Sequence, residues 1–132
     1  MTELTPAQRG FLENPYIGVA TTLRPDGSPH STVVWVDVDD DGVSFNTARP
    51  RAKPRHLEAD PRVSLVVVDP RDELRWLGIT GTATLVDEGA NDQIDRLARK
   101  YRGHERYQSY KEGETRVTVR IAPRWIESRK ID

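Results

Sequence analysis

Apolar and polar residues alternate or run together in strand-like segments over most of the chain. Residues 17–23, 29–38 and 43–47 are three such segments, and turns rich in Asp, Pro and Gly separate them at residues 24–27 and 39–42. Turn residues between short apolar runs are typical of β-hairpins. The first part of the chain therefore predicts three strands in an antiparallel meander.

The second half continues this pattern. Residues 62–68 are almost continuously apolar, which indicates burial on both faces. Residues 74–86 predict a long strand in which Gly78 and Gly81 mark a bulge or a bend. Apolar and polar residues alternate cleanly over residues 115–121, and a further extended piece follows. These three segments bring the predicted number of strands to six.

Helical spacing is confined to short segments. A capping box at Thr5 predicts a helix over residues 6–13, and Pro54 is suited to the first turn of a second one. Residues 87–102 carry apolar residues at helical spacing, and residues 104–110 predict another short helix. Because strands and helices do not alternate, the chain is expected to be mainly β, an antiparallel barrel with a few short helices.

A strongly basic stretch follows the third predicted strand directly. Within residues 46–57, Arg49, Arg51, Lys53 and Arg55 occupy every second position. They lie where a strand gives way to a helix N-terminus, a place where backbone N–H groups and the helix dipole favour an anion. Arg binds two phosphate oxygens at once and Lys adds a point charge. The stretch predicts a phosphate site, although solvated charges on a surface turn would give the same pattern.

Composition narrows the function. The 132 residues predict a single domain, residues 1–132, and the net charge of −1 argues against binding nucleic acid through overall charge. The absence of cysteine excludes disulfides, thiolate metal sites and thiol catalysis. No stretch resembles a signal peptide or a membrane span, so a cytoplasmic protein without a membrane partner is expected.

The motifs of several enzyme classes are missing. No G-x-G-x-x-G follows a strand, no P-loop is present, and the three histidines lack the spacing of a metal site. Trp35, Trp76 and Trp125 each lie in a predicted strand, where the barrel core or a subunit interface is expected. The alternative is the wall of a pocket for an aromatic ligand, which suits Trp76 best because glycine is nearby. An anion site on a β-barrel without a catalytic dyad fits an enzyme whose chemistry resides in a bound cofactor.

Two segments carry a resemblance to a known family. They are IGVATTLRPDGSPHSTVVWV (residues 17–36) and FNTARPRAKPRHLEADPRVSLVVV (residues 45–68), and GITGTATL (residues 78–85) follows. The most specific part is R-x-R-A-K-x-R-x-L followed by D-P-R-V-S-L. The chain resembles the actinobacterial deazaflavin-dependent branch of the pyridoxamine-phosphate-oxidase-like split β-barrel flavoproteins over nearly its whole length.

The resemblance implies a homodimeric split β-barrel that binds FMN or coenzyme F420 in a groove between subunits. The basic residues would hold the cofactor phosphate, residues 31–34 would lie against the ring system, and residues of the second subunit would close the pocket. His56 stands where relatives often have Asn. The implied cofactor-binding residues are Ser31, Thr32, Val33, Val34, Asn46, Thr47, Ala48, Arg51, Lys53, Arg55 and, from the second subunit, Trp76.

The function implied is that of an F420-dependent oxidoreductase, a reductase that transfers a hydride from reduced deazaflavin to an activated C=C or C=N bond of a small organic substrate. The proton donor is open between solvent and Tyr101, Tyr107 or Tyr110. Arg49 or Arg75 could receive the poly-glutamate tail of F420. The C-terminal tail lacks the Arg- and Trp-containing arrangement of true pyridoxamine phosphate oxidases, so vitamin B6 oxidation is not assigned.

Three alternatives stay open. The first is an FMN-binding oxidase or redox sensor of the same fold, and the second is a non-catalytic protein that sequesters the cofactor. The third is a small barrel that binds single-stranded nucleic acid through Arg and Trp, which the near-neutral charge disfavours.

Overall fold

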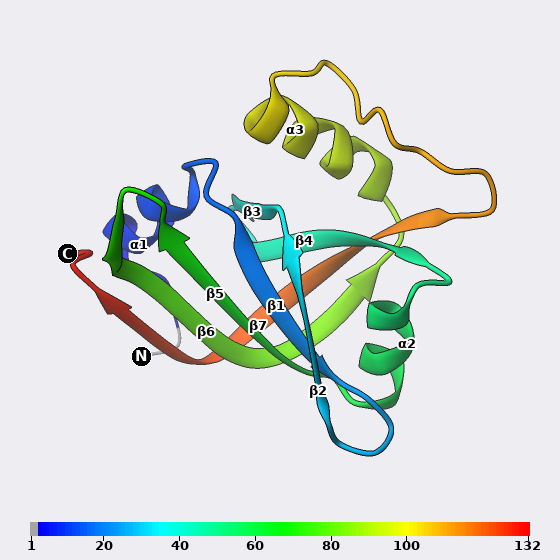
Figure 1. Cartoon of the computed structure of the whole chain (residues 1–132), viewed down its shortest axis with the longest axis horizontal. Helices are drawn as coiled ribbons and strands as arrows, with labels where there is room; N and C mark the ends of the chain where they lie inside the picture. The colour runs from blue at the N-terminus through cyan, green and yellow to red at the C-terminus, as the bar shows by residue number, and fades with distance from the viewer. Residues whose placement is uncertain (1–2) are drawn as a thin grey trace.

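The computed structural model describes residues 3–132, which form one antiparallel sheet of seven strands with three helices around it (Figure 1). The helices are α1 (Pro6–Leu12), α2 (Ala52–Ala59) and α3 (Ala90–Arg102). The strands are β1 (Gly18–Leu23), β2 (Pro29–Val34), β3 (Val36–Asp39), β4 (Gly42–Arg49), β5 (Arg62–Asp69), β6 (Asp72–Val86) and β7 (Thr115–Arg129). Of the helices in this part of the chain, none has the length and apolar character needed to cross a membrane.

The two edges of the sheet are joined to each other by a single residue. The strand order is β2-β1-β5-β6-β7-β4-β3, so the edge strands β2 and β3 are consecutive in the chain and only Trp35 lies between them. β2 pairs with β1 whereas β3 pairs with β4. The sheet must therefore curl until its edges meet at Trp35, and the edges separate again beyond that residue. This is a split barrel.

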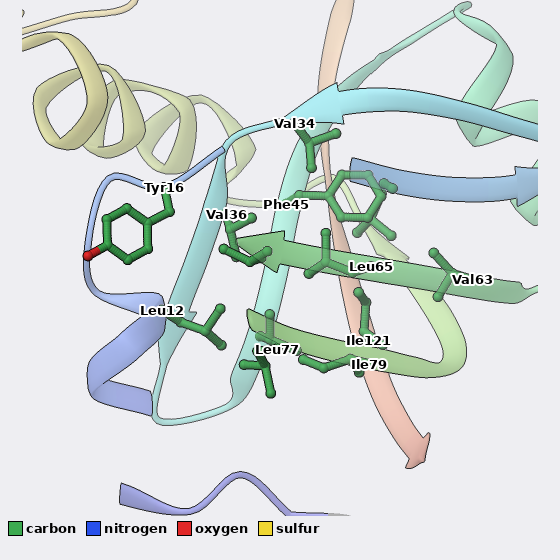
Figure 2. Close-up of a cluster of buried hydrophobic side chains, with 14 of the residues drawn as sticks. Leu12, Tyr16, Val34, Val36, Phe45, Val63, Leu65, Leu77, Ile79 and Ile121 are labelled. Carbon is green, nitrogen blue, oxygen red and sulfur yellow. The ribbon is translucent and has the colours of Figure 1, made fainter. Parts of the chain in front are cut away.

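Side chains on the concave face of the curled sheet form the core (Figure 2). Phe45 from β4, Leu65 from β5 and Ile79 from β6 are almost completely buried and point toward one another. Helix α1 adds Phe11 and Leu12, and the expected capping box at its start is confirmed. The expected mainly β, antiparallel fold is thus confirmed.

The number of strands and some of their ends differ from the prediction. The single strand expected over residues 29–38 is interrupted at Trp35, because its first half pairs with β1 and its second half with β4. This interruption gives seven strands where six were expected. The last strand runs on continuously to Arg129 because β6 pairs with it over its whole second half.

The short helix expected over residues 104–110 is absent. Residues 103–114 instead form a loop between α3 and β7. The backbone N–H of Tyr107, which in a helix would bind the carbonyl four residues earlier, donates to the Asp95 carboxylate at 2.8 Å. A contact with α3 thus replaces the local helical hydrogen bond. The expected stop of α3 at Gly103 is confirmed, since that glycine has a φ of 72°.

The C-terminal end of α3 is held against β3 and the segment before β1. Lys100 Nζ donates to the backbone oxygens of Leu12 and Val36, both at 2.7 Å. The Tyr101 hydroxyl donates to the Tyr16 carbonyl at 2.7 Å and accepts from the Val36 N–H at 2.9 Å. Burial raises the pKa of Tyr101 to about 12. These contacts fix α3 over β3 and β4 (Figure 1). Tyr101 of α3 also stacks on Trp35.

The bulge expected near Gly78 and Gly81 is confirmed at Gly81. The β6–β7 register shifts between Thr80 and Gly81. A Cβ atom at Gly81 would lie 2.0 Å from the backbone oxygen of Ala122. Because that obstacle is backbone of the paired strand, only glycine fits there.

We expect Gly81→Ala to lower the free energy of unfolding by about 3 kcal/mol, since β6 and β7 must separate to admit the methyl group. The matched control is Gly10→Ala in α1, where an added Cβ meets nothing within 4 Å and helix propensity favours alanine. Urea denaturation followed by circular dichroism measures both. Equal stability of the two variants would contradict the role assigned to Gly81.

Candidate functional site

A groove of about 240 Å³ opens where β2 and β4 separate beyond Trp35. β3 covers β4 only as far as Phe45, so the β4 edge from Asn46 onward faces the free edge of β2. One part of the groove is apolar and another part is cationic. Its lining residues are Ile17, Val33, Val34, Trp35, Asn46, Thr47, Arg51, Lys53, Ile94, Arg102, Tyr107 and Arg116.

The structure separates the four cations of the basic stretch. Arg49 forms ion pairs with Glu58 and Asp87 and does not line the groove. Arg51 and Lys53 both line it, whereas Arg55 lies in another hollow. The reason is helical geometry: α2 begins at Ala52, and two residues apart on a helix means about 200° of rotation. Lys53 and Arg55 therefore point to different sides of α2, and only Arg51 and Lys53 of the four cations meet in the groove.

Arg51 and Lys53 differ in their partners. Arg51, the N-cap of α2, donates from Nε and Nη2 to the two carboxylate oxygens of Glu114 at 2.7 and 2.9 Å. Lys53 has no carboxylate within 4 Å among residues 3–132. Burial and the neighbouring charge of Arg51 lower the pKa of Lys53. This lysine is therefore a cation that lacks a counter-ion.

Arg116 is a further cation of the groove, which the sequence analysis missed. Its relative exposure is 5%, its Nε donates to Asn46 Oδ1 at 2.8 Å, and its Cζ lies 5.0 Å from the centre of the Tyr107 ring. Burial lowers its pKa. The alternation of apolar and polar residues predicted Arg116 on the polar face of the last strand, and no feature of the sequence indicated that it is buried. The burial comes from α3 and the loop after it.

Asn46 is held in place by α3. Its Nδ2 donates to the Ala90 carbonyl and to Gln93 Oε1, both at 2.9 Å. Gln93 in turn donates to Ser44 and accepts from Thr118, both at 2.9 Å. The network fixes the amide of Asn46 so that its oxygen faces Arg116.

An aromatic cluster lies on the α3 side of the groove, and two of its members, Trp35 and Tyr107, line the groove. Trp35 stacks on Tyr101 with ring centres 5.4 Å apart, and Tyr107 meets it edge-on at 6.1 Å. The Arg102 guanidinium also lies over the Trp35 ring, with its Cζ 6.0 Å from the ring centre. Trp35 was expected in the barrel core or at a subunit interface, with the wall of a ligand pocket as the alternative. Its place between β2 and β3, where the chain changes strand partner, puts it in the groove, as in that alternative.

Of the tyrosines considered as proton donors, Tyr107 lines the groove and the other two do not. The hydroxyl of Tyr101 is occupied by backbone groups. The Tyr110 hydroxyl donates to the Asp95 carboxylate at 3.0 Å, and burial together with that carboxylate raises its pKa to about 12.

The expected ring-binding strand contributes in part. Val33 and Val34 line the groove, whereas Ser31 is exposed and bonds with Thr21 at 2.8 Å. Thr32 Oγ1 and, nearby on the same strand, His30 Nδ1 are buried without a hydrogen-bond partner in the described part of the chain. His56, which stands where relatives often have Asn, bonds through Nδ1 with the Thr22 hydroxyl at 2.8 Å.

The remaining expected residues divide as follows. Asn46 and Thr47 line the groove, and Ala48 is fully buried beside it. Trp76 lies on β6 opposite Val68 and away from this groove, so its contribution from a second subunit stays a prediction. Arg49 and Arg75, considered for the poly-glutamate tail, do not line the groove either, and Arg75 pairs with Asp69 at 3.1 Å.

The chemistry of the groove is that of a site for a molecule with an apolar planar part and an anionic end. Val33, Val34 and Ile94 offer apolar contacts, whereas Lys53 and Arg116 offer positive charge. Within residues 3–132 no three His, Cys, Asp or Glu side chains are grouped as metal ligands. The unpartnered cations fit a phosphate-bearing cofactor.

Comparisons with known proteins agree with this fold. An F420H(2)-dependent biliverdin reductase from Mycobacterium tuberculosis (strain CDC 1551 / Oshkosh) is 27% identical over 121 residues, which are 91% of this chain and 84% of that protein. A structure titled F420 Reductase superposes with a TM-score of 0.79 at 24% identity, covering 94% of this chain and 98% of the other. The conserved hypothetical protein Rv2991 from Mycobacterium tuberculosis superposes with a TM-score of 0.74 at 26% identity, covering 96% and 84%.

The family itself is shown by the sequence. Residues 4–130 match the family described as Pyridoxamine 5'-phosphate oxidase. The match covers almost the whole chain, including both sides of the groove, and confirms the resemblance on which the cofactor expectations rest. The chain belongs to the pyridoxamine 5'-phosphate oxidase family.

Proposed function

We propose that the protein is an F420-dependent reductase of small organic substrates. The observation that carries the proposal is the groove at the split of the sheet, where a lysine without a counter-ion lies beside a helix N-terminus and next to an apolar surface. Two relatives support the deazaflavin over the flavin, since one is named an F420H(2)-dependent biliverdin reductase and another an F420 Reductase.

The chain's own contribution is to bind and orient the cofactor. Lys53 neutralises the phosphate, and Val33, Val34 and Ile94 pack against the ring system and exclude water from it. Reduced F420, when bound, supplies a hydride. Tyr107, the tyrosine candidate in the groove, or solvent supplies the proton.

The α3 side of the groove, where Trp35 and Arg102 lie, indicates the class of substrate. Trp35 offers a flat aromatic surface, and Arg102 above it has no carboxylate within 4 Å in the described part of the chain. This pair suits a conjugated substrate that carries a carboxylate. Biliverdin is such a compound and is the first to test, because the relative mentioned above is named for it.

A second subunit completes the site in this proposal. The convex face of the sheet exposes an outer apolar patch, formed by Val19, Val33, Val66, Val68 and Trp125. Val33, Val19 and Val66 are direct neighbours across β2, β1 and β5. Val33 is 69% exposed and also lines the groove, so a partner covering the patch would close the groove on that side.

The first prediction concerns the cofactor. We expect the purified protein to bind F420 more tightly than FMN in equilibrium titrations followed by fluorescence, and to oxidise reduced F420 when biliverdin is added. Tighter FMN binding would favour a flavin oxidase or redox protein. F420 binding without turnover over a broad set of electrophilic substrates would favour a cofactor-sequestering protein, and binding of neither cofactor would contradict the proposal.

The second prediction concerns Lys53. Its pKa in the free protein lies below 10.5, and a bound phosphate raises it, so binding takes up a proton. F420 affinity is therefore expected to fall as the pH rises through the pKa of the free protein. Lys53→Arg, which stays charged, should remove that fall, and Lys53→Ala should weaken binding by about 10- to 100-fold at neutral pH.

The control for Lys53 is Lys111→Ala, which changes an exposed lysine of the loop after α3. It should leave both affinity and pH dependence as in the wild type. If the wild type and Lys53→Arg show parallel pH profiles, Lys53 does not contact the anion.

The third prediction concerns the outer apolar patch. We expect a dimer in size-exclusion chromatography with light scattering, and a monomer with weaker F420 binding for Val66→Glu, because a carboxylate cannot be buried unpaired in an apolar interface. Thr84→Glu, at an exposed position of β6 outside the patch, is the control. A dimeric Val66→Glu variant would place the interface elsewhere.

A further inference from the structure

We propose that Arg116 binds the phosphate of the cofactor together with Lys53, and that Arg55 does not. The inference rests on the proposed function, since it assigns the residues that recognise the anionic end of F420 or FMN. It replaces one member of the predicted set Arg51, Lys53 and Arg55 by an arginine that lies more than sixty positions later in the chain.

The first argument is the unmet hydrogen bond of a buried guanidinium. Arg116 is 95% buried, and its Nη1 has neither solvent contact nor a hydrogen-bond partner among residues 3–132. Charged groups are rarely buried without a partner, because they lose water and gain nothing in return. Arg116 lines the groove, so an anion bound there would supply the missing acceptor.

The second argument is the orientation of that guanidinium. Its Nε is committed to Asn46 Oδ1 at 2.8 Å, and the ring of Tyr107 covers its face. Tyr107 is itself fixed, because its backbone N–H donates to the Asp95 carboxylate. Both supports leave Nη1 as the donor for a ligand, and neither uses a carboxylate that would compete with one.

The third argument is charge. Glu114 already neutralises Arg51 through two hydrogen bonds. Lys53 and Arg116 line the groove beside Arg51, and neither has a carboxylate within 4 Å in the described part of the chain, although the charge of Glu114 also acts on Arg116. Lys53 and Arg116 can both donate hydrogen bonds to the oxygens of one phosphate group. Arg51 instead orients the start of α2 and the end of the loop that carries Tyr107.

Arg55 lies in different surroundings. It shares a separate hollow with Arg24, His56 and Arg62, on the side of α2 that faces the β1–β2 turn. Lys53 and Arg55 lie about 200° apart around α2, so a phosphate bound by Lys53 and Arg116 would lie on the other side of the helix from Arg55. Arg55 is for this reason the matched control: the same residue type, from the same basic stretch, at the position favoured by the sequence pattern.

The test compares Arg116→Gln with Arg55→Gln and uses two ligand pairs. FMN and riboflavin differ only in the phosphate, whereas the phosphate-free deazaflavin chromophore of F420 lacks both the phosphate and the poly-glutamate tail, so the flavin pair isolates the phosphate. Arg116→Gln should weaken binding of the phosphate-bearing member by about 10- to 100-fold and change the phosphate-free member by less than about twofold. Arg55→Gln should leave all four affinities within about threefold.

Two outcomes would overturn the inference: an unchanged affinity for the phosphate-bearing ligands in Arg116→Gln, or an equal loss for both members of each pair. Arg116→Lys, which retains the charge, should recover part of the affinity and shows whether loss comes from misfolding. Thermal denaturation of each variant provides the same check.

An independent readout separates this inference from the proposed function. If the wild type binds neither F420 nor FMN, the proposed function fails, and inorganic pyrophosphate then serves as the probe. The Nε–H signal of Arg116, identified in ¹H–¹⁵N spectra by its absence in Arg116→Gln, should shift on titration with pyrophosphate. An unmoved signal would refute phosphate binding by Arg116 whatever the cofactor.

Discussion

The change of strand partner at Trp35 is the constraint on which the rest of the structure depends. A sheet whose two edge strands are consecutive in the chain must curl until those edges meet, and here one residue joins them. β2 then leaves with β1, and β4 continues past the end of β3. The groove opens where β2 and β4 separate. The change of strand partner at Trp35 therefore both curls the sheet around its core and creates the site.

The groove is lined by more positive than negative charge. Ion pairs neutralise Arg49 and Arg51 inside the chain, whereas Lys53 and the buried Arg116 have no carboxylate within 4 Å among the described residues. Burial weakens the hydration of both cations and lowers the pKa of each. An anion that entered the groove would therefore meet cations that are poorly hydrated. Trp35 and Tyr107 line the same groove and offer aromatic surface to a planar ligand, and Tyr101 supports Trp35 from behind by stacking on it.

The sequence correctly predicted features that depend on residues close together in the chain, such as helix ends. The capping box at Thr5 begins α1, and Gly103 ends α3. Gly81 marks the bulge because β7 backbone approaches it too closely for any side chain. The failures are non-local: the strand over residues 29–38 breaks because its halves pair with different strands, and the helix over residues 104–110 is absent because Asp95 takes the Tyr107 N–H. No pattern within either segment records those partners.

The sequence by itself determined the class of fold, the basic stretch at the start of α2 and, through its resemblance, the family. These depend on periodicity, turn residues and motif, which are properties of neighbouring positions. The tertiary structure alone decided which cations share a site. Lys53 and Arg55 diverge because they lie on opposite sides of a helix, and Arg116 joins Lys53 because β7 pairs with β4. Distance along the chain carries no information about such contacts, since strand pairing across a curled sheet sets them.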